Sequence, residues 1–148
     1  FDSAEAAKAA FATPAGQAGR ADADAHVSRM ERLAVVEYPF LDKGTSPRFK
    51  LVAALKRRGD LDRPSFKSWW LERHAPMVLP FPSLARYQVN LVEEGEETFA
   101  DGVAEVCFDD LPTLMRVMTS APVKAVQEDS RVHTAARYRL FAEEHRII

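Results

Sequence analysis

The stretch of sequence that decides the fold runs over residues 48–76 and reads RFKLVAALKRRGDLDRPSFKSWWLERHAP. It begins with a mostly apolar segment that fits a strand, and a Gly-Asp pair typical of a turn comes soon after. Asp62 and Pro64 mark the start of a helix, because an aspartate caps a first turn and a proline there loses no hydrogen bond. Pro76 restricts the residue before it, so this helix should end near Ala75. The stretch therefore predicts a strand, a turn and a helix.

The sequence after this stretch continues the pattern. Residues 85–92 alternate polar and apolar side chains with period two, which predicts a half-buried strand. A further strand is expected over residues 102–108, two consecutive helices over 110–118 and 122–131, and a last strand over 137–144. The order β-α-β-β-α-β, with its second helix broken in two, predicts an α+β fold of the ferredoxin-like type.

The N-terminal part of the chain has a different composition. Residues 2–12 are rich in alanine and predict a helix, and a second, shorter helix should end near residue 26. Residues 33–38 are rich in β-branched and aromatic side chains and predict a strand. Residues 42–47 contain glycine and proline and have the composition of a linker, so we place a domain boundary there.

The N-terminal part also repeats the end of the chain. Identical residues recur at an offset of 107 (133 − 26) in the pairs Phe1-Asp2 and Phe108-Asp109, Ala18 and Ala125, Asp22 and Asp129, His26 and His133, and Leu33 and Leu140. The same order of helix, break, helix and strand accompanies them. We therefore expect residues 1–41 to be the second half of a first repeat, 42–47 a linker and 48–148 a complete domain. The chain begins without a methionine, and we expect it to be a piece of a longer one.

Two segments of the sequence resemble the EthD family. Residues 65–76 show the family's phenylalanine, aromatic-tryptophan pair and His-Ala-Pro at the family's spacing, and residues 101–111 are similar to its third strand and following helix start. The resemblance covers roughly residues 48–146 and, with the repeat, indicates a tandem-EthD protein. It implies a dimeric α/β-barrel, in which the open sheet face of one unit pairs with that of a second unit in the same chain or in a homodimer. The apolar side chains expected on that face are Val52, Leu55, Val89 and Leu91.

His74 is the candidate catalytic residue. Residues four apart share a helix face, so Phe66, Trp70 and His74 form one stripe. Histidine can take and give a proton near neutrality, which suits a general acid or base in a pocket between the helix and the sheet. Phe66, Trp70 and Tyr87 would then form a flat apolar wall for a substrate. The alternative is a core-facing stripe in which His74 is a structural residue at the helix end, hydrogen-bonded to a carbonyl.

Asn90 is a second kind of candidate. On a strand, Arg86, Gln88 and Asn90 point to one face and Tyr87 to the other. Asn90 therefore either binds ligand carbonyls from the inward face of a barrel or faces water. Cys107 lies in an apolar strand, where a thiol behaves as a small buried hydrophobic group rather than a nucleophile.

Composition excludes several classes of partner. The net charge of −2 with scattered basic residues gives no electrostatic case for nucleic acid or an anionic membrane. The single cysteine excludes an internal disulfide and CxxC sites, and the four histidines show no HxxxH or HExxH spacing. We expect no metal, no cofactor, a small hydrophobic or aromatic ligand, and a cytoplasmic location.

The resemblance implies a function in small-molecule metabolism. The family includes proteins tied to degradation of ethers and aromatic compounds, and the same fold occurs in lactone isomerases, monooxygenases and haem-handling enzymes. The leading hypothesis is a catabolic isomerase or lyase that acts on an aromatic, lactone or polyketide-like substrate by cofactor-free proton transfer through His74. The alternatives are a non-catalytic ligand-binding or accessory barrel and a monooxygenase-like oxidoreductase, because a fold does not choose among chemistries.

Overall fold

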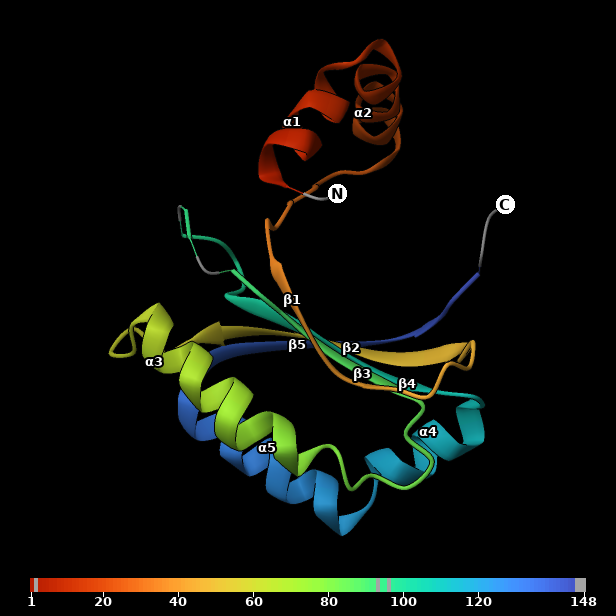
Figure 1. Ribbon diagram of the computed structural model, residues 1–148, viewed down its shortest axis with the longest axis vertical. Coiled ribbons are helices and arrows are strands. Elements are labelled where there is room, and N and C mark those ends of the chain that lie inside the picture. The colour runs from red at the N-terminus through yellow and green to blue at the C-terminus, as the bar shows by residue number, and fades with distance from the viewer. Residues whose placement is uncertain (2, 93, 96, 146–148) are drawn as a thin grey trace. The chain divides into compact units, whose positions relative to one another are not determined.

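The computed structural model describes residues 1, 3–92, 94–95 and 97–145 of the chain (Figure 1). The chain separates into two compact units, Phe1–Ala34 and Val35–Ile148. The larger unit contains the sheet and the candidate catalytic histidine, and the smaller one contains the N-terminal helices. Each unit is described by itself.

The larger unit is built on an antiparallel five-stranded sheet with the order β1-β3-β4-β2-β5. The strands are β1 (Val36–Asp42), β2 (Phe49–Arg57), β3 (Arg86–Leu91), β4 (Gly102–Phe108) and β5 (Thr134–Glu143). Four of them, β5-β2-β4-β3, make the predicted ferredoxin-like sheet, and β1 adds a fifth strand beside β3. The predicted α+β fold is confirmed.

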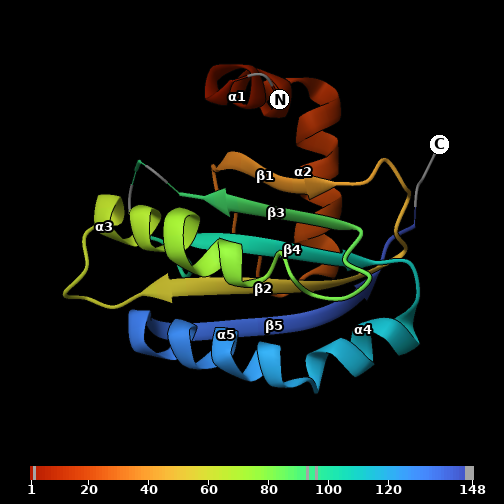
Figure 2. The same cartoon turned by 60° about the horizontal axis from the view of Figure 1, so that its bottom comes forward.

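Three α-helices cover one face of this sheet, as Figure 2 shows: α3 (Arg63–Ser68), α4 (Leu111–Met118) and α5 (Ala121–His133). Asp62 and Asp110 cap α3 and α4, because their carboxylates accept hydrogen bonds from the backbone N–H groups of Ser65 and Thr113, each at 2.7 Å. In the part of this unit that the structure describes, the opposite face of the sheet carries no helix. None of the described helices is both long enough and apolar enough to cross a membrane.

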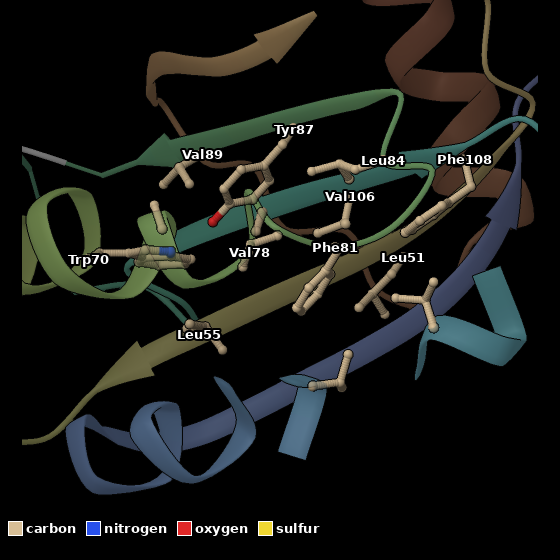
Figure 3. Packing of buried hydrophobic residues seen from close by; sticks show 14 of the residues in the cluster. Leu51, Leu55, Trp70, Val78, Phe81, Leu84, Tyr87, Val89, Val106 and Phe108 are labelled. Atoms are coloured by element: carbon tan, nitrogen blue, oxygen red, sulfur yellow. The ribbon is translucent and has the colours of Figure 1, made fainter. Parts of the chain in front are cut away.

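The core lies between these helices and the sheet. Figure 3 shows its side chains, which come from the strands, from the helical segment after α3 and from the loop that leads to β3: Leu51, Leu55, Trp70, Val78, Phe81, Leu84, Tyr87, Val89, Val106 and Phe108. The expected open-face set was therefore wrong for three of its four members, Leu55, Val89 and Leu91, which are buried in this core. Strand alternation gives the reason, because Val52 and Leu55 are an odd number of residues apart and cannot share a face.

The first strand differs in position from its prediction. The sequence predicted a strand over residues 33–38, whereas β1 runs from Val36 to Asp42. It is paired along its length with β3, from Val36 opposite Leu91 to Asp42 opposite Arg86. Pairing with β3, rather than local composition, sets where β1 begins and ends. A strand continues only where its neighbour has backbone N–H and C=O groups to pair with.

The smaller unit is a pair of helices, α1 (Ala4–Ala12) and α2 (Pro14–His26). Ser3 caps α1 and Thr13 caps α2, through side-chain oxygens that accept from backbone N–H groups at 3.0 and 3.1 Å. No residue of α2 is buried. Within this unit α2 packs against α1, and all its side chains remain at least partly exposed.

Candidate functional site

His74 is held by a carboxylate that lies far away in sequence. The Nδ1 atom of His74 lies 2.7 Å from the Oδ2 atom of Asp129, which α5 carries. The same oxygen accepts a hydrogen bond from the indole N–H of Trp69 at 3.0 Å. His74 is only 5% exposed. The arrangement fixes the imidazole ring and assigns Nδ1 to the carboxylate, which leaves Nε2 for exchange of a proton.

Burial decides the charge of this histidine. Desolvation lowers the pKa of His74 below its ordinary value, and the hydrogen bond and charge of Asp129 only partly oppose this effect. The ring is therefore neutral at pH 7, donates Nδ1–H to Asp129 and presents an unprotonated Nε2. A neutral imidazole oriented by a carboxylate is suited to act as a base.

The helix that carries His74 widens at this point. After α3, residues Trp69–His74 form a π-helical turn, η1, and Ala75–Met77 a 3₁₀ turn, η2. In η1 the N–H of Ala75 bonds the carbonyl of Trp70, five residues earlier. Residues five apart are then about one turn apart, which brings the Trp69 and His74 rings within 4.7 Å of each other. The α-helical spacing assumed from sequence did not place Trp69 beside His74.

His133 completes the surroundings of Asp129. Its ring stacks on Trp69 with centroids 4.5 Å apart, and its Nδ1 lies 2.8 Å from the backbone carbonyl oxygen of Asp129. The Trp69 ring thus packs against both His133 and His74. Because Trp69 is positioned in this way, its N–H is aimed at the Asp129 carboxylate.

A small cavity adjoins His74 between the helices and the sheet. Its volume is about 70 Å³, and residues from β2, β3, β4, β5 and the helices line it. The lining that matters for chemistry consists of His74, Trp70, Tyr87, Gln127, Ser130 and Arg139. Figure 3 shows the Tyr87 hydroxyl pointing toward the Trp70 indole. Burial raises the pKa of Tyr87 well above its ordinary value, with Trp70 acting in the opposite direction, so the phenol remains a proton donor.

Two predicted site residues do not join this cavity. Phe66 is buried beside Trp69 and Trp70, with ring centroids 5.2 and 5.4 Å away, and lines a different cavity of about 220 Å³. Asn90 lies on the other face of β3, as its alternation with Tyr87 predicted. There it accepts a hydrogen bond from Gln88 at 2.7 Å and donates one to the Val103 carbonyl at 3.2 Å. The structure brings together His74, Trp70 and Tyr87 only.

The open face of the sheet carries a polar network. Lys50 lies 2.7 Å from Glu105 and 3.1 Å from Glu144, and Arg86 lies 3.0 Å from Glu144. Burial raises the pKa of the Cys107 thiol beside these groups, which disfavours the thiolate that a nucleophile needs. Among the residues that the structure describes, no three His, Cys, Asp or Glu side chains gather as a metal-binding group.

Asp129 and Trp69 are the functional residues that sequence reasoning missed. Asp129 was visible only as half of the repeat pair with Asp22, without a role. Its recurrence four residues before a histidine in both copies, Asp22 to His26 and Asp129 to His133, was the available signal. Trp69 was visible only as part of the aromatic-tryptophan pair of the EthD resemblance, because its place beside His74 depends on the π-helical turn.

The free energy of unfolding should depend on pH through His74. The pKa of His74 is lower in the folded protein than in the unfolded chain, where it is about 6.5. At pH values between these two pKa values, the unfolded chain therefore binds more protons than the folded protein. The contribution of His74 to stability is then complete above pH 6.5 and is lost as the pH falls toward the folded pKa. We expect the wild-type protein to lose more stability over this interval than a His74→Gln variant. Urea unfolding at a series of pH values measures the difference, and equal slopes for the two proteins would contradict the burial of a neutral His74.

Comparison with known proteins shows which protein family and which solved structures this chain resembles. The sequence pattern of the EthD domain matches residues 58–135, which is more than half of the chain. A search of curated proteins finds no match. Among solved structures, an ethyl tert-butyl ether d (EthD) family protein from Bacillus halodurans superposes with a TM-score of 0.58 and 22% identity, covering 66% of this chain and 99% of that one.

Two further structures share the fold. A dimeric ferredoxin-like protein from Bacteroides fragilis has a TM-score of 0.53 and 16% identity over 65% of this chain and 95% of its own. SnoaB, a cofactor-independent oxygenase from Streptomyces nogalater, has a TM-score of 0.53 and 13% identity over 70% and 98%. These identities show a common fold and no more. The pattern match, which includes His74 and Asp129, places the chain in a family: it belongs to the EthD domain family.

Proposed function

We propose that the chain is a small-molecule catabolic enzyme of the EthD type that acts on an aromatic, lactone or polyketide-like substrate by cofactor-free proton transfer. The observation that carries this proposal is the pair formed by the buried His74 and the half-buried Asp129 beside a partly apolar cavity. A carboxylate that orients a neutral imidazole is the arrangement that general-base catalysis requires.

In the proposed reaction, Nε2 of His74 takes a proton from a C–H or O–H group of the substrate. Asp129 stabilises the imidazolium that forms and keeps the ring in place, while Trp69 holds the carboxylate. The phenol of Tyr87 can donate a hydrogen bond to the oxyanion that develops on the substrate. Return of the proton to a neighbouring atom gives an isomerisation, and loss of a leaving group gives an elimination.

The size of the cavity limits the substrate. An engineered cavity of about 150 Å³ holds benzene, whereas the cavity beside His74 has about 70 Å³. An aromatic ring therefore enters only if part of the wall moves. Met118 and the exposed Arg139 supply long, flexible side chains to that wall and are the groups that can move aside. The same small volume supports the second candidate function, a non-catalytic ligand-binding or accessory barrel.

Solvent exchange separates these functions. Purified protein, incubated in D₂O with phenolic polyketides or aromatic lactones, should form a product that carries deuterium at the position protonated by His74, with no oxygen consumed. Turnover of none of these compounds would favour the accessory barrel. Substrate-dependent oxygen uptake would instead favour a monooxygenase-like enzyme, the alternative supported by the shared fold with SnoaB.

The tandem-EthD arrangement is also part of the proposal. Shifting α2 by the repeat offset of 107 gives the bounds of α5, and shifting α1 gives α4 to within one residue. The caps correspond as well, since Ser3 and Asp110 each accept from the N–H group three residues later. Common element bounds and common capping contacts support two EthD copies in one polypeptide, of which residues 1–41 are the end of the first.

Pairing of two EthD units would cover the open face of the sheet. Tyr138 and Leu140 are exposed on this face, beside the polar network around Lys50. The dimeric state of the Bacteroides fragilis protein supports a paired barrel, formed within the chain or by a homodimer. A barrel removes open sheet edges and would bury these side chains.

A further inference from the structure

We propose that the indole N–H of Trp70 and the phenol O–H of Tyr87 together bind one oxygen atom of the substrate, and that this substrate is a carbonyl compound. The inference deepens the function proposed above and rests on it. Trp70 is 1% exposed, and among the residues that the structure describes its Nε1 atom has no hydrogen-bond partner. A buried N–H group without an acceptor is costly, because it has given up its hydrogen bonds to water. Since Trp70 lines the cavity beside His74, a ligand in that cavity is the natural source of the acceptor.

Tyr87 brings a second donor to the same place. Its buried side chain lines the cavity together with Trp70. Figure 3 shows the Tyr87 hydroxyl turned toward the nitrogen of the Trp70 indole, and Trp70 lowers the pKa of Tyr87 against the larger effect of burial, so the two polar atoms are close together. An indole nitrogen is a donor only, and a protonated phenol can donate as well. Two neutral donors therefore meet at one corner of the cavity.

The chemistry of these donors selects the ligand atom. A carboxylate or phosphate is already charged when it binds, and proteins hold such groups most strongly with cationic side chains. Two neutral donors instead suit an oxygen that is uncharged in the substrate and becomes negative during the reaction. A carbonyl oxygen does so when a neighbouring C–H group is deprotonated, whereas an ether oxygen gains no such charge. The site therefore favours a ketone or a lactone.

The spacing of Trp70 and His74 suits such a substrate. Their rings lie edge to face with centroids 6.4 Å apart. A carbonyl oxygen about 3 Å from the donors then leaves room for the neighbouring carbon about 3 Å from the base. Nε2 of His74 takes the proton from that carbon, the C–H electron pair forms a C=C bond, and the carbonyl π pair moves to the oxygen. In a conjugated substrate the imidazolium returns the proton to a different carbon and the C=O bond forms again, so the product is an isomer.

NMR of the indole N–H groups tests this oxygen site without any turnover. The chain has two tryptophans, so ¹⁵N-tryptophan labelling gives two indole resonances, which replacement of either residue by phenylalanine assigns. We expect cyclopentanone to move the Trp70 resonance downfield and to leave that of Trp69, whose N–H is already bonded to Asp129 at 3.0 Å. Methylenecyclopentane, with a CH₂ group in place of the oxygen, should not cause the shift. Equal shifts with both compounds, or none with cyclopentanone, would overturn the oxygen site and leave His74 as a base to be tested by its own variant.

A Tyr87→Phe variant isolates the second donor, because it removes only the hydroxyl group. We expect the affinity for cyclopentanone, titrated through the Trp70 resonance, to fall roughly tenfold, the effect of losing one hydrogen bond in a buried site. The affinity for methylenecyclopentane should not fall. Tyr138→Phe is the matched control, because Tyr138 is 53% exposed and lies on the open face of the sheet. An unchanged cyclopentanone affinity in Tyr87→Phe would remove Tyr87 from the site and overturn the two-donor arrangement.

Discussion

Replacing His74 by glutamine should lower turnover by about 10²–10⁴-fold, the usual contribution of a positioned general acid or base. Glutamine is polar and of similar reach, so it can still hydrogen-bond to Asp129, but it cannot take up a proton. The loss should therefore appear in kcat, with a smaller change in KM. Steady-state kinetics with the substrate found by solvent exchange gives both parameters.

The control for this variant is the same substitution at an exposed histidine. The side chain of His145 is 73% exposed and lies outside the cavity, so His145→Gln should keep wild-type turnover. Circular dichroism should show that both variants are folded. If His74→Gln is folded and retains wild-type turnover, His74 is structural and the proton-transfer mechanism is rejected.

Local patterns were sufficient to predict most of the fold. The strands β3 and β4 were predicted to within one residue because period-two alternation and flanking turn residues are local signals. The starts of α3 and α4 were predicted from capping aspartates for the same reason. The bounds of β1 were not, because they depend on a pairing with β3 about fifty residues further along the chain.

The candidate site was predictable only in part. The sequence indicated His74, Trp70 and Tyr87. His74 and Trp70 share one stripe of a helix, and Tyr87 lies on the apolar side of an alternating strand, so each side chain was expected to face the interior of the fold. The sequence could not indicate that Asp129, 55 residues from His74, is the partner, because that contact arises from how α5 packs beside η1. The π-helical turn was missed for a related reason. Nothing in residues 69–74 distinguishes it from an α-helix until the surrounding core selects it.

Trp70 connects the fold and the site, and its truncation should have the largest effect on stability. Trp70 is 1% exposed and contacts the rings of Phe66, Trp69 and His74. Replacement of a fully buried tryptophan by alanine removes this packing and leaves a void, at a cost of about 3–5 kcal/mol. We expect Trp70→Ala to lose this amount in urea unfolding. Phe99→Ala is the control, because Phe99 is 38% exposed and should cost less than about 1 kcal/mol.

The void left by Trp70→Ala also gives a test of where the cavity lies. Since Trp70 lines the cavity beside His74, the truncation should merge the two spaces into one that accepts indole. Indole at about 100 times its Kd should then restore about 2.7 kcal/mol to the variant and nothing to the wild type. Recovery in the variant alone would support a cavity that an aromatic ligand can enter once its wall moves. Truncation without rescue would mean that the surrounding side chains collapse into the space, and His74 would then face packed core rather than a binding site.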